Sequence, residues 1–243
     1  MTQAFPPLSI ATFNIRLGLQ QGLGAIADLI DSMGAPDIVA LQEVGQHWTM
    51  GPGGDTTAHL AQSLDYPHHL FTPTIERNTD ASQPAYYGHA ILSRWPITDP
   101  RCTDLPQRDD EPRVLTSALI DRPSGPFQLL STHLSHRNTD RPAQGEVLVY
   151  EASEQRCPSL PTFVVGDLNA DTNDPPSPWL YRLLSGFVDA DERLQRPTFP
   201  ASAPTRRIDY ILARGADLQS IDVIDPHGAS DHRALLSHWG PPP

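Results

Sequence analysis

The sequence Thr162-Phe-Val-Val-Gly-Asp-Leu-Asn-Ala-Asp171 begins as an apolar, β-branched run and ends abruptly in polar residues. This pattern is typical of a buried strand that delivers its last side chains to one edge of a sheet. Side chains two residues apart on a strand point to the same face, so Asp167 and Asn169 are expected to project together. Carboxylate and amide oxygens are ligands that hard divalent cations prefer. The stretch therefore predicts a strand whose end carries an oxygen-rich pair.

Apolar runs of the same kind recur along the chain. We expect strands at residues 8–16, 37–43, 87–93, 114–121, 127–134, 163–166, 207–212 and 234–238. Helix-spaced apolar residues and favourable end residues predict helices at residues 24–33, 57–64, 142–156 and 179–184. Outside its helix, the segment 45–80 is expected to form surface loops. Because strands dominate and helices are inserted between them, the pattern fits two packed sheets flanked by helices.

Length and composition limit the class of protein. The chain has 243 residues and no linker long enough to divide it, so we expect one domain spanning residues 1–243. The formal net charge is −12, and all 17 basic residues are arginines. The molecule as a whole therefore lacks a basic footprint for nucleic acid, although a local arginine patch remains open. Cys102 and Cys157, the two cysteines, are too few for a disulfide framework or a zinc site.

The N-terminal segment lacks a basic region followed by an apolar region. No run approaches the ~18 apolar residues that a transmembrane helix needs. We therefore expect a cytoplasmic protein without a membrane segment. The sequence indicates no protein partner.

Six apolar segments end in side chains that can bind a metal or a phosphate. Taken singly, each has a structural interpretation: Glu43 as a solvated acid, Asn14 in a turn, His133 as a core histidine, or Asp209 in an ion pair with a neighbouring arginine. Six such accidents in one chain are improbable, which favours a shared site. The segments are Phe13-Asn14, Gln42-Glu43, Thr132-His133, Gly166-Asp167-Leu168-Asn169, Ile208-Asp209-Tyr210 and Ser230-Asp231-His232.

With these motifs in this order, the chain resembles the endonuclease/exonuclease/phosphatase superfamily of DNase I-like, metal-dependent phosphohydrolases. The matching pieces include Gly88-His-Ala-Ile-Leu-Ser93 in addition to the six strand ends, and together they extend from residue 12 to residue 232. The resemblance implies a four-layer α/β sandwich, with two packed mixed β-sheets flanked by helices. It places the site at one end of the two sheets.

The resemblance also implies roles for individual residues. Glu43 is expected to be the main metal carboxylate, with Asn14 and Asp231 close by. Asp167 is expected to orient or deprotonate the attacking water, and Asn169 to hold a phosphoryl oxygen.

Three further residues complete the implied catalytic set. His232, oriented by Asp209, is expected to stabilise charge on the phosphate or to transfer a proton. His133 takes the place of a second residue facing the phosphate or the leaving group.

The chemistry of phosphate esters accounts for these residue types independently. A phosphodiester is anionic and repels hydroxide, and a divalent cation offsets that charge and polarises the P–O bond. Mg²⁺ prefers oxygen ligands and keeps several waters, so one or two protein acids are sufficient. Glu43 with Asp231 suits Mg²⁺ better than a cysteine and histidine cage would. We therefore expect Mg²⁺ as the cofactor, with Mn²⁺ as a substitute.

Three secondary features lie outside this set. His89 stands where many relatives carry asparagine, and it is expected either to contact substrate or to be a tolerated change. Arg113 is a candidate phosphate partner, because its planar guanidinium suits phosphate oxygens, with a surface ion pair as the alternative. The segment Thr198-Phe199-Pro200 is expected at the rim of the pocket.

The substrate is the least determined part of the sequence. The resemblance covers enzymes that act on DNA, RNA, lipids and small phosphate esters with nearly the same core, and site chemistry does not fix the substrate. We expect a phosphodiester or phosphomonoester substrate, with nuclease or repair-type activity on nucleic acid as the leading specific version. A sphingomyelinase-like or small-molecule phosphodiesterase is the alternative. A binding module on a decayed hydrolase fold is a remote one, because each core position carries a competent residue.

Overall fold

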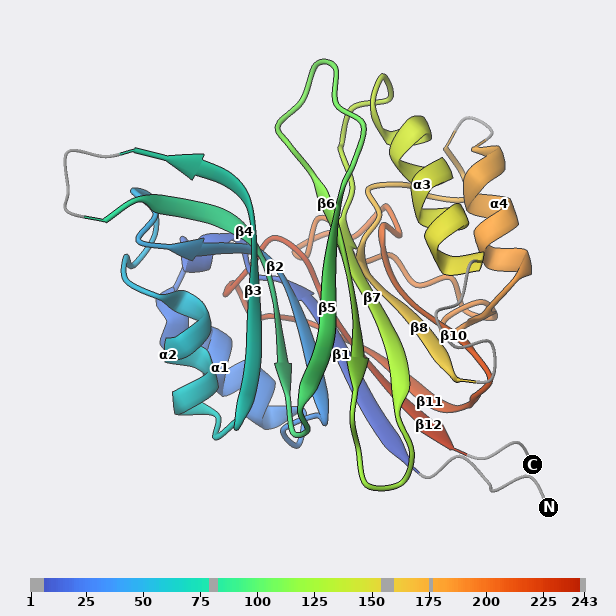
Figure 1. Ribbon diagram of the computed structural model, residues 1–243, viewed down its shortest axis with the longest axis horizontal. Coiled ribbons are helices and arrows are strands. Elements are labelled where there is room, and N and C mark those ends of the chain that lie inside the picture. The colour runs from blue at the N-terminus through green and yellow to red at the C-terminus, as the bar shows by residue number, and fades with distance from the viewer. Residues whose placement is uncertain (1–6, 79–82, 154–159, 175–176, 241–243) are drawn as a thin grey trace.

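The computed structural model describes residues 7–78, 83–153, 160–174 and 177–240. Two six-stranded sheets make up its centre (Figure 1). The first sheet has the order β11 (Asp217–Ile224), β12 (Ala234–Gly240), β1 (Leu8–Asn14), β2 (Ile38–Gln46), β4 (Ala85–Ser93) and β3 (His68–Arg77). The second has the order β5 (Ile97–Asp104), β6 (Val114–Ile120), β7 (Phe127–His133), β8 (Thr162–Asp167), β10 (Asp209–Arg214) and β9 (Val188–Asp189).

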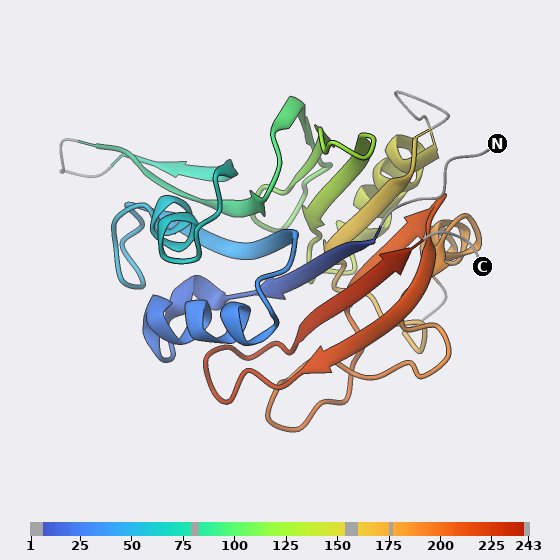
Figure 2. The ribbon, with the colours of Figure 1, turned by 90° about the horizontal axis from the view of Figure 1, so that it is seen from below.

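The sheets and helices form four layers, as the two views in Figures 1 and 2 show. Helices α1 (Gly22–Ser32) and α2 (Thr56–Ser63) cover the outer face of the first sheet. Helices α3 (Arg141–Ser153) and α4 (Pro178–Ser185) cover the outer face of the second. A short 3-10 helix, η1 (Arg16–Gly18), follows β1.

Each boundary between layers buries its own hydrophobic cluster. The cluster between the sheets includes Phe127, Phe163 and Trp239, whose rings meet edge to face with centroids 5.3 and 5.4 Å apart. Such packing adds about 0.5–1.5 kcal/mol per aromatic pair beyond the burial of apolar area. The central strands are therefore buried on both faces, which is why they read as nearly continuous apolar runs in the sequence.

Both sheets are mixed. Parallel pairs β1–β2 and β7–β8 lie at their centres, with antiparallel neighbours on either side. The expected architecture of two packed mixed sheets flanked by helices is therefore confirmed.

The sequence prediction missed four strands, β3, β5, β9 and β11, and these are the four edge strands. Edge strands β3, β5 and β11 each bury at most one residue fully, so their apolar periodicity is weak. Strands β3 and β5 also contain Pro73 and Pro100 at shifts of register, where a missing N–H costs no ladder bond. The prediction of surface loops for residues 68–77 was thus wrong. The expected end of α3 at residues 154–156 lies outside the described residues, as does Cys157.

No helix in the described part of the chain is long and apolar enough to span a membrane.

Candidate active site

Three neighbouring strands of the second sheet end in register at one edge. His133 at the end of β7 lies beside Asp167 at the end of β8, and Asp209 at the start of β10 lies beside Asp167 on the other side. Gly166 allows this approach, because a Cβ there would lie 2.0 Å from the carbonyl oxygen of Thr132. Its φ of +135° also favours glycine. The glycine thereby lets the central strand carry its carboxylate between the two neighbours.

Asn169 reaches the same point by a different route from the one that the sequence predicted. Strand β8 ends at Asp167, and Asn169 adopts a left-handed φ of 50° beyond the strand. Its backbone N–H donates to Asp167 Oδ1 at 2.9 Å, while its side-chain Nδ2 lies 2.9 Å from the carbonyl oxygen of Leu134 and 3.1 Å from His133 Nε2. The alternation of a strand is therefore not what brings the two side chains together. A tight turn does so, and it places the Asn169 amide nitrogen against the Leu134 carbonyl and the His133 ring.

The first sheet contributes Asn14 and Glu43. Asn14 ends β1, and Glu43 lies in β2 at a shift of register between Leu41 and Val44, with a left-handed φ of 55°. Such bulges redirect a side chain relative to the strand. Asn14 Nδ2 donates to Glu43 Oε1 at 3.0 Å and to Asp167 Oδ2 at 3.2 Å, so one amide joins the acids of the two sheets.

The segment before β12 completes the cluster. The hydroxyl of Ser230 donates to the carbonyl oxygen of Asn14 at 2.6 Å and anchors this segment to β1. Asp231 forms an ion pair with Arg16 at 3.3 Å and is partly exposed. His232 is buried beside it.

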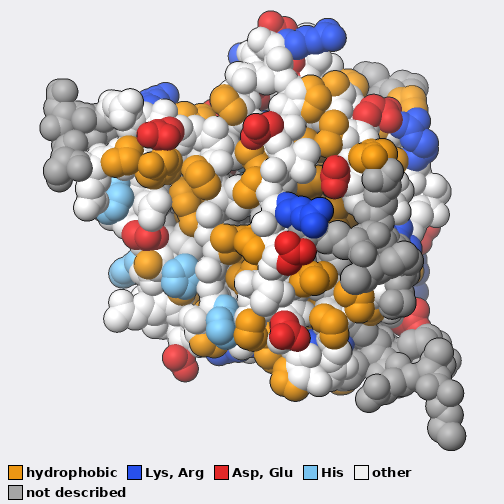
Figure 3. Space-filling view, viewed as in Figure 1, with side chains coloured by type: hydrophobic (Ala, Val, Ile, Leu, Met, Phe, Trp, Pro, Cys, Tyr) orange, Lys and Arg blue, Asp and Glu red, His pale blue; other side chains and the backbone are white. Residues whose placement is uncertain are grey.

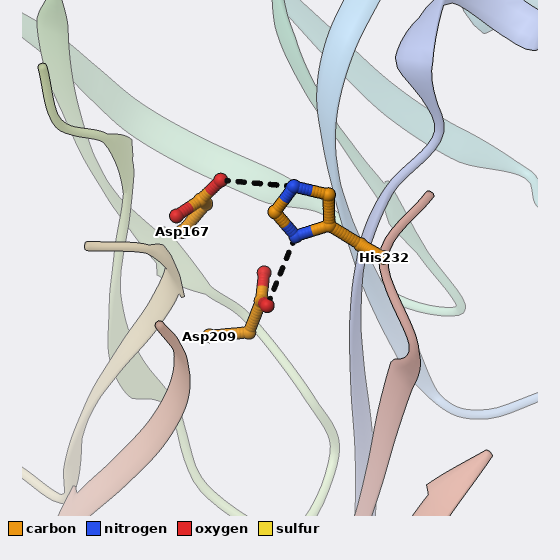
Figure 4. A group of neighbouring side chains, drawn as sticks. All are labelled: Asp167, Asp209 and His232. Atoms are coloured by element: carbon orange, nitrogen blue, oxygen red, sulfur yellow. Dashed lines mark hydrogen bonds and ion pairs between the residues drawn. The ribbon is translucent and has the colours of Figure 1, made fainter. Parts of the chain in front are cut away.

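Both ring nitrogens of His232 face carboxylates (Figure 4). Nδ1 lies 3.1 Å from Asp209 Oδ2, within hydrogen-bond distance, and Nε2 lies 3.7 Å from Asp167 Oδ2. Asp167, Asp209 and His232 approach one another from three different segments, with ligand atoms within 4.8 Å of one another.

The electrostatics of this cluster follow from burial and from two close carboxylates. Burial lowers the pKa of His232, but the negative charges of Asp209 and Asp167 outweigh burial and raise it to about 10. Burial raises the pKa of Asp167 to about 7, and Asp209 adds to the shift while His232 opposes it. At neutral pH the imidazole of His232 is therefore protonated, and Asp167 is close to its own titration point.

His133 behaves differently from His232. Burial, with added repulsion from Arg113, holds the pKa of His133 well below its usual value. Its Nε2 also lies 3.3 Å from Asp167 Oδ2. The site therefore holds one charged and one neutral histidine on either side of the same carboxylate.

Two sets of residues are candidate metal ligands. The first is the expected set of Glu43, Asn14 and Asp231, and the second is the cluster of Asp167, Asp209 and His232. A protonated imidazole has no lone pair to offer a cation. The cluster around His232 is thus better suited to proton transfer than to metal binding in its protonated state.

The set around Glu43 suits a hard cation. Burial raises the pKa of Glu43, although the hydrogen bond from Asn14 and the charge of His232 oppose the shift. A nearby cation would lower that pKa again, since opposite charge favours the ionised form. The oxygen of the Asn14 amide accepts the backbone N–H of Arg16 at 3.1 Å, so in this geometry Asn14 positions Glu43 through its nitrogen.

Arg113 and His89 are both buried, as Asn14, Asp167 and Asp209 are. Arg113 is 5% exposed and pairs with Glu111 at 2.8 Å, with Asp110 at 3.8 Å. His89 is 1% exposed, and its Nε2 lies 2.8 Å from Thr116 Oγ1 on the other sheet. Burial, together with the charge of Arg113, lowers the pKa of His89 to about 4. His89 is therefore bonded to the facing sheet, and the two alternatives for it, a substrate contact or a tolerated change, stay predictions.

Sequence reasoning did not identify Thr198 as part of the site. Of the segment Thr198-Phe199-Pro200, expected at the rim of the pocket, Thr198 is completely buried, and its hydroxyl donates to Asp209 Oδ2 at 2.5 Å. The ring of Phe199, which is partly exposed, packs on His232 with centroids 4.8 Å apart. No spacing signal marks these residues, because they contact the site from a hairpin outside both sheets.

Comparison with known proteins identifies the family of the chain. The model of the endonuclease/exonuclease/phosphatase family matches residues 11–232, and the chain belongs to that family. Its members are in general hydrolases of phosphoester bonds and typically depend on a metal. No curated protein sequence matches the chain.

Solved structures share the fold. An endonuclease/exonuclease/phosphatase from Beutenbergia cavernae DSM 12333 has a TM-score of 0.81 and 26% identity, and the match covers 97% of this chain and 72% of that one. The mannosyl-6-phosphatase of Bacteroides thetaiotaomicron VPI-5482 has a TM-score of 0.74 and 17% identity over 95% and 98% of the two chains. The human Nocturnin catalytic domain with bound sulfate has a TM-score of 0.71 and 21% identity over 97% and 94%. The architecture is the DNase I-like four-layer α/β sandwich.

Proposed function

We propose that this protein is a divalent-metal-dependent phosphoesterase, which hydrolyses phosphodiester or phosphomonoester bonds by in-line attack of an activated water. One observation carries the proposal. A buried carboxylate near its titration point, Asp167, lies between a protonated and a neutral histidine. One amide joins it to a second, partly buried acid, Glu43. Groups of opposite protonation state on one site are what acid–base catalysis requires.

Asp167 is the proposed acceptor of the water proton. Its Oδ1 is fixed by the backbone N–H of Asn169, and its Oδ2 lies among Asn14, His133 and His232. A pKa of about 7 means that the carboxylate can accept a proton at neutral pH and release it afterwards.

The histidines and Asn169 are proposed to handle the phosphate. His232, held by Asp209, directs its Nε2–H into the site and neutralises charge on a phosphoryl oxygen. His133 faces the leaving group. Asn169 would donate to a phosphoryl oxygen by exchanging its bond to His133 for one to the substrate.

Glu43, with Asp231, is the proposed ligand set for Mg²⁺ or Mn²⁺. When bound, the cation would offset the charge of the phosphate ester and polarise its P–O bond. Asn14 keeps the Glu43 carboxylate directed at the site, and Arg16 holds Asp231 beside it.

The charge of the surface favours small esters over long nucleic acids. On the face in Figure 3, blue arginine side chains are interspersed with red acidic ones. Non-specific nucleic-acid binding depends on many cationic contacts with phosphates, and a net charge of −12 opposes it. Hydrolysis at a nucleic-acid end requires fewer such contacts, so this activity is kept in the proposal. A sphingomyelinase-like or small-molecule phosphodiesterase is the alternative. We further propose a cytoplasmic location and a single domain.

The test is a hydrolysis panel with Mg²⁺, Mn²⁺ and EDTA. The substrates are bis-p-nitrophenyl phosphate, p-nitrophenyl phosphate, a sugar 6-phosphate, and labelled single- and double-stranded DNA. Asp167→Asn should remove the activity, whereas Asp104→Asn, a matched change of an exposed acid on edge strand β5, should preserve it. A folded protein that hydrolyses none of these substrates with either metal would contradict the proposal and favour a binding module.

A further inference from the structure

Asp209 is a buried carboxylate with hydrogen bonds to only one of its two side-chain oxygens among the described residues. It is 1% exposed, and its Oδ1 has no hydrogen-bond partner among the described residues. Its Oδ2 accepts from His232 Nδ1 at 3.1 Å and from Thr198 Oγ1 at 2.5 Å. The orientation of this carboxylate therefore depends on Oδ2 and on the two groups that donate to it.

The direction of the Thr198 hydroxyl is fixed by its other contacts. Thr198 Oγ1 accepts the backbone N–H groups of Ile208 and Asp209 at 3.3 and 3.4 Å. A hydroxyl has one proton, and with its acceptor side occupied that proton is directed at Asp209 Oδ2. Thr198 thus holds both the backbone and the carboxylate of Asp209.

The rest of this hairpin is bonded to the segment that carries His232. Thr198 donates its N–H to the carbonyl oxygen of Arg206 at 2.8 Å, and its own carbonyl oxygen accepts the N–H of Arg233 at 2.8 Å. Ala201 donates its N–H to the carbonyl oxygen of Asp231 at 2.6 Å. With the ring of Phe199 against His232, the hairpin contacts both members of the Asp209–His232 pair from one side.

From this geometry we infer that Thr198 is a positioning residue for catalysis, which acts through Asp209 to align the His232 imidazole. The inference rests on the proposed function, because it assigns Thr198 to the reaction proposed above. Thr198 is completely buried and does not touch substrate, so its effect is on the geometry of the pair and not on substrate affinity.

The first test separates turnover from binding. The hydrogen bond from Thr198 to the charged Asp209 is proposed to hold the aligned geometry of His232. Its loss in Thr198→Val should therefore lower kcat about tenfold or more, with KM changed less than about twofold. Thr198→Ser keeps the hydroxyl and should retain most of kcat. Thr205→Val changes an exposed threonine of the same hairpin and is the matched control. Equal losses in Thr198→Ser and Thr198→Val, or an unchanged kcat in both, would overturn the inference.

A double-mutant cycle shows whether the effect passes through Asp209. If Thr198 acts through the carboxylate, Thr198→Val should cause little further loss in an Asp209→Asn background. Additive losses would mean that Thr198 contributes to turnover by another path, and they would also overturn the inference.

A proton NMR experiment makes the inference independent of any activity. The Nδ1–H of His232, bonded to a buried carboxylate, should give a downfield resonance that Asp209→Asn removes. Thr198→Val should shift or broaden this resonance relative to wild type, whereas Thr198→Ser should leave it nearly unchanged. A shift in an otherwise inactive protein would support the role of Thr198 in the geometry of the pair and contradict the proposed function alone. A wild-type protein without the resonance, or one unchanged in Thr198→Val, would refute the inference whatever the hydrolysis panel gave.

Discussion

Replacing Asp167 with asparagine should stabilise the metal-free protein while it abolishes turnover. The carboxylate is completely buried near Asp209, and its pKa is raised from an ordinary value of 3.8 to about 7. A raised folded-state pKa means that folding favours the protonated acid. Its contribution to stability is therefore fully present below about pH 3.8 and is lost as the pH rises through about pH 7.

The magnitude follows from the size of this shift. With about 1.4 kcal/mol for each pKa unit, burying Asp167 costs about 4 kcal/mol near pH 8, where the folded protein holds it ionised. Near pH 5 it costs about 2 kcal/mol, because folding must protonate a group that is ionised in the unfolded chain. An asparagine avoids this cost. Its NH₂ group, however, replaces one of the two carboxylate oxygens and then faces another donor, either the Asn169 N–H or Asn14 Nδ2. That loss is on the order of 1–3 kcal/mol and does not depend on pH. The net gain in unfolding free energy should thus be about 1–3 kcal/mol near pH 8.

Urea unfolding in EDTA at the two pH values measures the effect. The difference between Asp167→Asn and wild type should grow by about 2–3 kcal/mol between about pH 5 and about pH 8. His232 titrates between these pH values in the unfolded chain of both proteins, and Asp209, the larger cause of its raised folded-state pKa, is present in both, so most of its contribution cancels. Asp104→Asn, at an exposed site, should show no such growth. A difference that stayed constant with pH, or one that favoured wild type more at the higher pH, would refute the reasoning.

Four further predictions each concern a single residue. Glu43→Gln should raise the Mg²⁺ concentration needed for activity, and an unchanged Mg²⁺ titration would place the cation elsewhere. His232→Ala should nearly abolish kcat with the fold intact, and Asp209→Asn should impair it less; a His232→Ala enzyme with more than about half of wild-type activity would exclude His232 from the mechanism. Gly166→Ala should lower the unfolding free energy by at least about 2 kcal/mol, because its Cβ meets the Thr132 carbonyl. Gly24→Ala, in a helix with open space around the new Cβ, is the control and should be neutral or stabilising, and equal effects of the two changes would contradict this account.

Much of the fold could be predicted because the central strands are buried on both faces. Runs such as Phe163–Val165 leave no choice between core and surface, and their composition identifies them as strands. Edge strands such as β3 and β11 face water along one side and one face, so their sequences carry no comparable pattern. They form because a central strand offers them unpaired backbone groups, and that depends on tertiary structure.

The candidate site divides in the same way. The joint occurrence of six such strand ends in one chain made Glu43, Asp167 and His232 candidates, although each residue taken singly has an ordinary structural interpretation. Their chemical states did not follow from type, since the same imidazole is neutral at His133 and charged at His232. That difference depends on which carboxylates lie nearby and how deeply each ring is buried.

By itself the sequence determined the central strands and the oxygen-rich side chains at their ends, since local apolar runs and polar residues indicate them. The order of these motifs along the chain determined the family. The tertiary structure alone decided that a left-handed turn carries Asn169 to Asp167, and that His89 is buried between the sheets. It also decided that Thr198, from a distant hairpin, holds Asp209. These relations join residues far apart in the chain, and hydrogen bonds across such separations leave no periodic trace in the sequence.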